Sequence, residues 1–142
     1  MKQAIVLAIG PVNDTMDDAR YLQHCRQLWH DFATTLELRT RSLEEDEPLR
    51  QLAQGFCAVD RGEADIYEDG PGLIMRLFTH HTEFAPTLPR TLLWFLGSDC
   101  LQMLTDEEIE GFETLEARRE AAAARGEILD WDAAARDVLP LA

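Results

Sequence analysis

The sequence predicts an all-α protein, a single compact domain of five to seven helices packed as an irregular helical bundle. Apolar residues recur at spacings of three and four in several segments, which is the period of an amphipathic helix. Residues that start or stop helices stand at the ends of these segments. With 142 residues, of which 46% are hydrophobic and 28% charged, the chain is long enough for one buried core. We therefore expect one helical domain over residues 1–142.

Residues 1–13 are expected to form an N-terminal arm whose conformation, helix or strand, the sequence leaves open. The apolar run from Ala4 to Ile9 has no period, and no second strand is predicted that could pair with it. The first long helix is predicted over about 16–39, after N-cap candidates at 13–15. Its apolar stripe consists of Leu22, Cys25, Trp29, Phe32, Ala33 and Leu36.

A second stripe, from Leu49 to Cys57, predicts a helix that starts after the acidic connection 42–48 and ends near Gly62. Gly55 weakens this helix by about 1 kcal/mol relative to Ala, so we expect a neighbour to pack closely against it. The acidic segment 63–70 is predicted to be a loop before Pro71. A short helix is expected to follow it, through about residue 82.

The central buried helix is predicted to begin at Pro89 and to continue to Leu104, because its apolar residues cover most of its circumference. Thr105 and Glu108 have the spacing of a capping box and predict the start of the next helix, over about 106–125. Asp130 is predicted to cap a last short helix that stops near residue 140.

The stretch LWFLGSDCLQMLTDEEI, from Leu93 to Ile109, resembles a family of uncharacterised proteobacterial proteins. These proteins carry a related LWFLGGDCLH segment followed by PDEEI. The resemblance implies an all-helical chain and brings no activity with it. Ser98 stands where the family has Gly, and Gln102 where it has His, so a function that depends on that His does not carry over.

The strong negative charge predicts the class of partner. The chain has 27 Asp and Glu against 13 Lys and Arg, a formal net charge of −14. This balance disfavours nucleic acids and anionic membranes and favours basic proteins or cations. Three widely spaced cysteines indicate a reducing compartment, and no apolar run is long enough to span a bilayer. We expect a cytoplasmic protein that binds another protein, without nucleic acid or membrane, and homo-oligomerisation stays open.

The candidate pocket or interface lies around the predicted central helix. Asp99 is unusual as a charged residue in an apolar helix. It would bond Arg76 or Arg90, cap backbone amides at a neighbouring helix end, or line a small pocket or an interface. Cys100 is interpreted as core packing, because a neighbouring carboxylate raises rather than lowers the pKa of a thiol. No catalytic residue, metal site or cofactor is predicted. The candidate residues are Trp94, Gly97, Asp99, Cys100, His81 and Glu107.

Three functional hypotheses follow, and the first is preferred. The protein is a small acidic interaction or regulatory protein that binds a partner protein. Alternatively, it is an enzyme or enzyme subunit with a small pocket near Asp99 and His81, although the absence of a catalytic signature argues against an enzyme. The third hypothesis is a nucleic-acid mimic whose carboxylates imitate rows of phosphates.

Overall fold

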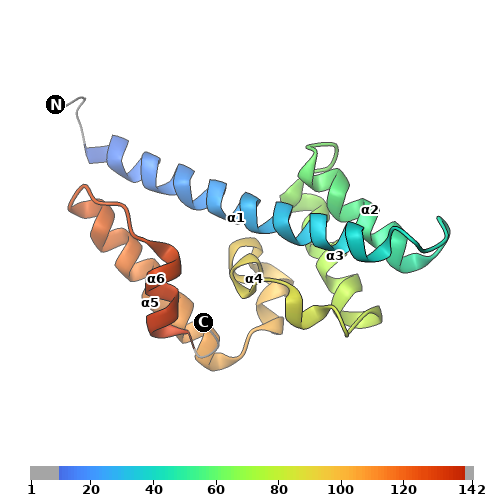
Figure 1. The fold of residues 1–142 in the computed structure, drawn as a ribbon. Coiled ribbons are helices and arrows are strands. Elements are labelled where there is room, and N and C mark those ends of the chain that lie inside the picture. The colour runs from blue at the N-terminus through green and yellow to red at the C-terminus, as the bar shows by residue number, and fades with distance from the viewer. Residues whose placement is uncertain (1–9, 140–142) are drawn as a thin grey trace. The chain divides into compact units, whose positions relative to one another are not determined.

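The computed structural model describes the backbone of residues 10–139 and the side chains of residues 19–139. This part of the chain is helical and contains no strand, so the all-α prediction is confirmed (Figure 1). It contains six α-helices and two short 3-10 helices: α1 (Gly10–Thr40), α2 (Pro48–Asp60), α3 (Ile66–His80), η1 (Ala85–Thr87), α4 (Arg90–Leu96), η2 (Ser98–Met103), α5 (Asp106–Ala124) and α6 (Trp131–Val138). None of these helices is long and apolar enough to cross a membrane.

The chain forms two compact units. The first unit comprises residues 1–23 and 105–142, and the second unit comprises residues 24–104. A single domain over residues 1–142 stays a prediction. The apolar run at residues 4–9, which belongs to the predicted N-terminal arm, lies outside the described residues.

Helix α1 begins earlier than the sequence pattern indicates. Its first residue is Gly10, so residues 13–15 lie inside the helix, and their prediction as N-caps is wrong. The physical reason is Pro11, which stands in the first turn. A proline there loses no helical hydrogen bond, and its fixed φ suits the helix.

The core of the second unit is built where α1 meets α2. Trp29 is 1% exposed, and its Nε1 donates a hydrogen bond to the carbonyl oxygen of Phe56 at 2.9 Å. The Phe56 ring lies 4.8 Å from that of Trp29 and 5.2 Å from that of Phe32, measured between centroids. From Cys25 to Leu36 the predicted apolar stripe of α1 therefore faces this core, as its spacing indicates, whereas Leu22 is half-buried and belongs to the first unit.

Helices α2 and α3 lie side by side in the second unit (Figure 1). A Cβ atom at Gly55 would stand 2.6 Å from the Cδ2 atom of Leu73 on α3. The close packing predicted at Gly55 is therefore confirmed.

The acidic segment before Pro71 is not a loop in its second half, which corrects the sequence prediction. Helix α3 begins at Ile66, and Asp65 caps it by accepting a hydrogen bond from the Tyr67 amide at 2.7 Å. The carboxylates of Glu68 and Asp69 lie in the first turn, where the helix dipole favours negative charge. The acidic composition that suggested a loop is thus the composition of a helix N-terminus.

The predicted single helix from Pro89 to Leu104 is divided in two. Helix α4 ends at Leu96, because Gly97 adopts φ 67° and ψ −153°, a conformation open essentially to glycine alone. The 3-10 helix η2 then continues to Met103. The centre of this segment is buried as predicted, since Leu92, Leu93 and Cys100 are each 0% exposed.

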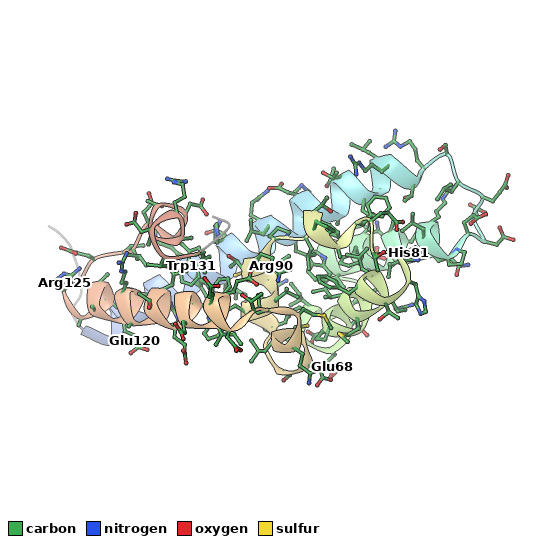
Figure 2. The ribbon with its side chains drawn as sticks, turned by 90° about the horizontal axis from the view of Figure 1, so that it is seen from below. Glu68, His81, Arg90, Glu120, Arg125 and Trp131 are labelled. Atoms are coloured by element: carbon green, nitrogen blue, oxygen red, sulfur yellow. The ribbon has the colours of Figure 1, made fainter. Side chains whose placement is uncertain are left out.

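The first unit contains α5 and α6, which pack against each other. The predicted capping box is present: Thr105 accepts from the Glu108 amide at 3.1 Å, and the Glu108 carboxylate accepts from the Thr105 amide at 2.9 Å. Asp130 caps α6 as predicted. The Trp131 ring is buried, whereas Glu120 projects from the other side of α5 (Figure 2).

Candidate functional site

Four of the six residues proposed from the sequence lie on one segment, α4 to η2. Trp94 is half-buried on α4, Gly97 forms the junction, Asp99 is exposed, and Cys100 is 0% exposed. These four residues lie close together because they are neighbours in the sequence. The structure corrects the expectation for Asp99, which lies at the surface of η2 and not inside an apolar helix.

An exposed Asp99 needs no internal partner, because water solvates its carboxylate. Arg90, one of the expected partners, instead donates from Nη2 to the Met103 carbonyl oxygen at 2.7 Å. This bond ties the start of α4 to the end of η2. Burial raises the pKa of the Cys100 thiol, and the Asp99 charge raises it further, while the side chain itself is 0% exposed in the core.

The other two predicted residues lie elsewhere. His81 follows α3 as its half-buried C-cap residue, at the opposite end of that helix from Glu68 (Figure 2). Glu107 is exposed in the first turn of α5, in the first unit, where it borders a hollow of about 390 Å³ with Glu110 and Asp137. Among the described side chains, no group of three or more His, Cys, Asp or Glu is arranged to hold a metal ion.

A groove of about 370 Å³ lies along α1 in the second unit, and we call it the α1 groove. Its residues come from the C-terminal half of α1 and from the turn that contains η1. The floor is apolar and buried, the walls are half-buried, and the rim is exposed. Phe32 and Leu36 form the floor, Leu28, Phe84 and Pro89 form the walls, and Asp31, Thr35, Arg39 and Thr87 form the rim.

The two charged residues of the α1 groove each contact a neighbouring side chain. Gln27, one turn before Asp31 on α1, donates from Nε2 to the Asp31 Oδ1 atom at 2.9 Å. The guanidinium carbon of Arg39 lies 5.8 Å from the centroid of the Phe84 ring, within the range of a cation–π contact. The rim therefore offers one carboxylate and one guanidinium beside an apolar floor.

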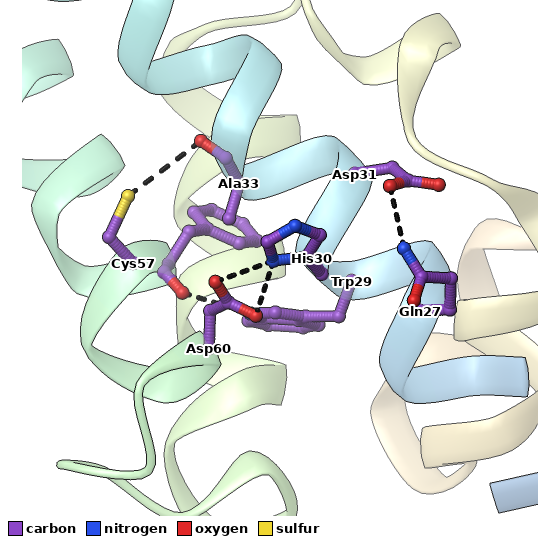
Figure 3. A network of polar contacts seen from close by, with 8 residues as sticks. Gln27, Trp29, His30, Asp31, Ala33, Cys57 and Asp60 are labelled. Atoms are coloured by element: carbon purple, nitrogen blue, oxygen red, sulfur yellow. Dashed lines mark hydrogen bonds and ion pairs between the residues drawn. The ribbon is translucent and has the colours of Figure 1, made fainter. Parts of the chain in front are cut away.

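The opposite side of this part of α1 is attached to α2 by polar contacts (Figure 3). The Nδ1 atom of His30 lies 2.8 Å from Oδ2 and 3.0 Å from Oδ1 of Asp60. This hydrogen bond, together with the Asp60 charge, raises the pKa of His30 above its ordinary value of 6.5. The Cys57 Sγ atom donates to the Ala33 carbonyl oxygen at 3.7 Å. These contacts fix the rotation of α1 and therefore the face that lines the groove.

A smaller cavity of about 130 Å³ lies where α1 ends beside α2, and Arg41, Arg50 and Arg61 are among its lining residues. Each of these arginines has a partner in its own chain: Arg41 pairs with Glu37, Arg50 donates to the Leu43 carbonyl oxygen, and Arg61 pairs with Glu63. The pKa of the Cys57 thiol, which lines the same cavity, is raised first by burial and then by the charge of Glu37.

The sequence pattern missed the α1 groove. Leu28 forms a row at a spacing of four with Phe32 and Leu36 of the apolar stripe, which was a signal that the apolar face of α1 is wider than the predicted stripe. Nothing in the sequence indicates that Phe84 and Pro89 lie beside these residues of α1. The three cavities described above are lined by neither Asp99 nor His81.

The comparisons with known proteins identify a family and no activity. No curated protein matches the chain significantly, and no solved structure does. The PA2817-like family matches residues 14–141, which cover most of the chain. The narrower resemblance of residues 93–109 to proteobacterial proteins stays a prediction. Because the match extends over both compact units, the chain belongs to the PA2817-like family.

Proposed function

We propose that this protein is an acidic interaction module of the cytoplasm that binds a basic segment of a partner protein in the α1 groove. The observation that supports this proposal is the α1 groove itself, an apolar hollow with two oppositely charged residues at its rim. Sites that bind ligands or peptides are typically concave and mostly apolar, with a few placed polar groups. Apolar side chains of a partner would occupy the floor at Phe32 and Leu36.

The charge of the chain supports a basic partner. A formal net charge of −14 attracts a basic segment over long distances and repels acidic ones. Burial of an apolar side chain in the groove would then supply affinity, at roughly 25 cal/mol per Å² of apolar surface removed from water. Charge would govern the rate of encounter, and the groove would govern the lifetime of the complex.

Two adjacent threonines on α1 allow a matched test of this proposal. Thr35 lies on the rim of the groove, whereas Thr34 is also exposed on α1 but does not line it. We expect Thr35→Arg to fill the groove and abolish partner capture from lysate. Thr34→Arg, which makes the same change of charge and size, should retain it.

The readout is quantitative mass spectrometry of captured proteins, with circular dichroism melting to show that both variants fold. A partner that is recovered equally with the Thr35→Arg and the wild-type proteins would show that the α1 groove is not the binding site. A partner lost with both variants would also contradict the proposal, because the charge change rather than the groove would then be responsible.

A further inference from the structure

We infer that the α1 groove binds its partner segment in one direction, with a cationic group of the segment at Asp31 and a carboxylate at Arg39. This inference rests on the proposed function and specifies the chemistry of the partner. The segment carries apolar side chains between a basic residue and a carboxylate. Its two charged ends match the two charged ends of the groove.

The geometry of α1 sets the distance between the two charges. Asp31, Thr35 and Arg39 recur every four residues, so they follow one edge of the helix and line the same side of the groove. Eight residues at 1.5 Å each separate Asp31 from Arg39 by about 12 Å along the helix axis. The groove is therefore a row of apolar side chains with opposite charges at its two ends.

The guanidinium of Arg39 can bind a carboxylate of the partner segment. Its guanidinium carbon lies 5.8 Å from the centroid of the Phe84 ring, and a contact with a ring face uses none of the N–H donors of the guanidinium. Among the described residues, Arg39 takes part in no ion pair with a carboxylate of its own chain. An incoming carboxylate would therefore displace no internal partner and would receive two parallel hydrogen bonds.

The carboxylate of Asp31 can bind a cationic group of the partner segment. Gln27 bonds to its Oδ1 atom and orients the carboxylate, while the Oδ2 atom can accept from an ammonium or guanidinium group. A segment bound in the reverse direction would place its carboxylate beside Asp31 and its cation beside Arg39. Like charges would then face each other at both ends, which disfavours the reversed orientation.

The distance between the charges gives the length of the segment. About 12 Å corresponds to roughly four residues of extended chain at about 3.3 Å each. The minimal partner is therefore a tetrapeptide that begins with a basic residue and ends with a carboxylate. We assign that carboxylate to the C-terminus of the partner protein, because a chain that ends there needs no residue beyond the four that span the groove.

Synthetic peptides can test the direction without knowledge of the natural partner. The probe is acetyl-Lys-Leu-Ala-Leu with a free C-terminal carboxylate, titrated into the full ¹⁵N-labelled chain and followed by amide chemical shifts. Three related peptides serve as comparisons: the C-terminal amide, the peptide with Glu in place of Lys, and an amidated pentapeptide with Glu added at its end.

We expect the free acid to bind the wild-type protein about two- to five-fold more tightly than the amide, the ratio that corresponds to one exposed ion pair. Arg39→Gln should reduce this ratio to about one, and Asp31→Asn should remove the preference for Lys over Glu. Asp31→Lys should reverse that preference. Arg26→Gln, an exposed substitution on α1 outside the groove, should leave both preferences unchanged.

The outcomes separate this inference from the proposed function. Equal affinity for acid and amide, ratios unchanged by Arg39→Gln and Asp31→Asn, or no shift of groove resonances with any peptide would overturn the inference. If Thr35→Arg still abolishes partner capture in that case, the groove binds a partner without a preferred direction. Tighter binding of the free acid than of the amide supports the inference. Tighter binding of the Glu pentapeptide alone would show that an acidic side chain supplies the carboxylate and would overturn its assignment to a C-terminus.

Discussion

Ser98 is the one residue other than glycine in the described part of the chain with a positive backbone φ, at 50°. It follows Gly97, so two consecutive residues have a positive φ where α4 gives way to η2. A side chain in this region of backbone conformation costs roughly 1–2 kcal/mol, so glycine is favoured over serine at position 98.

We predict that Ser98→Gly raises the free energy of unfolding by up to about 1 kcal/mol. Relief of the backbone strain exceeds the added entropy of glycine in the unfolded chain, which is about 0.5–1 kcal/mol. Gly97→Ala is the control and should lower stability by about 1–3 kcal/mol. Urea denaturation measures both changes, and a loss of stability for Ser98→Gly would show that the Ser98 side chain contributes more than its strained backbone costs.

At the scale of the elements, α1 is attached to α2 partly through an exposed ion pair, so this contact depends on pH. The pKa of His30 is raised by its hydrogen bond to Asp60 and by the charge of that residue. The stabilisation is therefore fully present below the unfolded pKa of about 6.5 and is lost as the pH rises through the higher folded value.

We predict that the stability difference between the wild-type protein and His30→Gln is larger near about pH 6 than near about pH 9. The measurement is the urea midpoint of both proteins across this range. Asp60→Asn should remove the same pH dependence, because it removes the negative charge that favours the protonated form of His30. A difference independent of pH would mean that His30 contributes only uncharged contacts.

Two glycines inside helices illustrate how packing decides the role of the same residue type. Gly55 on α2 faces Leu73, whose side chain is 5% exposed and has little room to move. Gly72 on α3 is exposed, and nothing lies within 4 Å of a Cβ atom built there. The sequence alone assigns both positions the same cost in helix stability.

We predict opposite effects of the same substitution at these two positions. Gly55→Ala should lower the free energy of unfolding by about 1–3 kcal/mol through overpacking against Leu73. Gly72→Ala should raise it by about 0.5–1 kcal/mol, because alanine reduces the entropy of the unfolded chain and meets no neighbour. Thermal or urea unfolding of the two variants checks both signs, and stabilisation by Gly55→Ala would show that α2 and α3 are not closely packed at this point.

For the molecule as a whole, the helix boundaries were predicted well where a capping motif specifies them. Two caps were predicted correctly, the capping box of Thr105 with Glu108 and the N-cap Asp130. Each one accepts hydrogen bonds from backbone amides within four residues, so its formation depends on the local sequence. Errors arose where a local signal allows two structures. Pro11 and the carboxylates before Pro71 fit both a loop and the first turn of a helix.

The candidate site could be predicted only in part. Placement of Asp99 inside an apolar helix assumed that the apolar run from Pro89 was continuous, and the conformation of Gly97 breaks it. The α1 groove is formed because Phe84 and Pro89 lie beside α1. Their position depends on the path of the chain after α3. No periodicity within α1 contains that information.

The sequence alone was sufficient for the helical class of this protein, the caps at Thr105 and Asp130, the negative charge and the apolar stripe of α1, because each depends on residues close together in the chain. The exposure of Asp99 and the charged groove beside α1 became evident only in the tertiary structure. These properties depend on which distant segments meet, and the free energy of that packing is shared among many side chains.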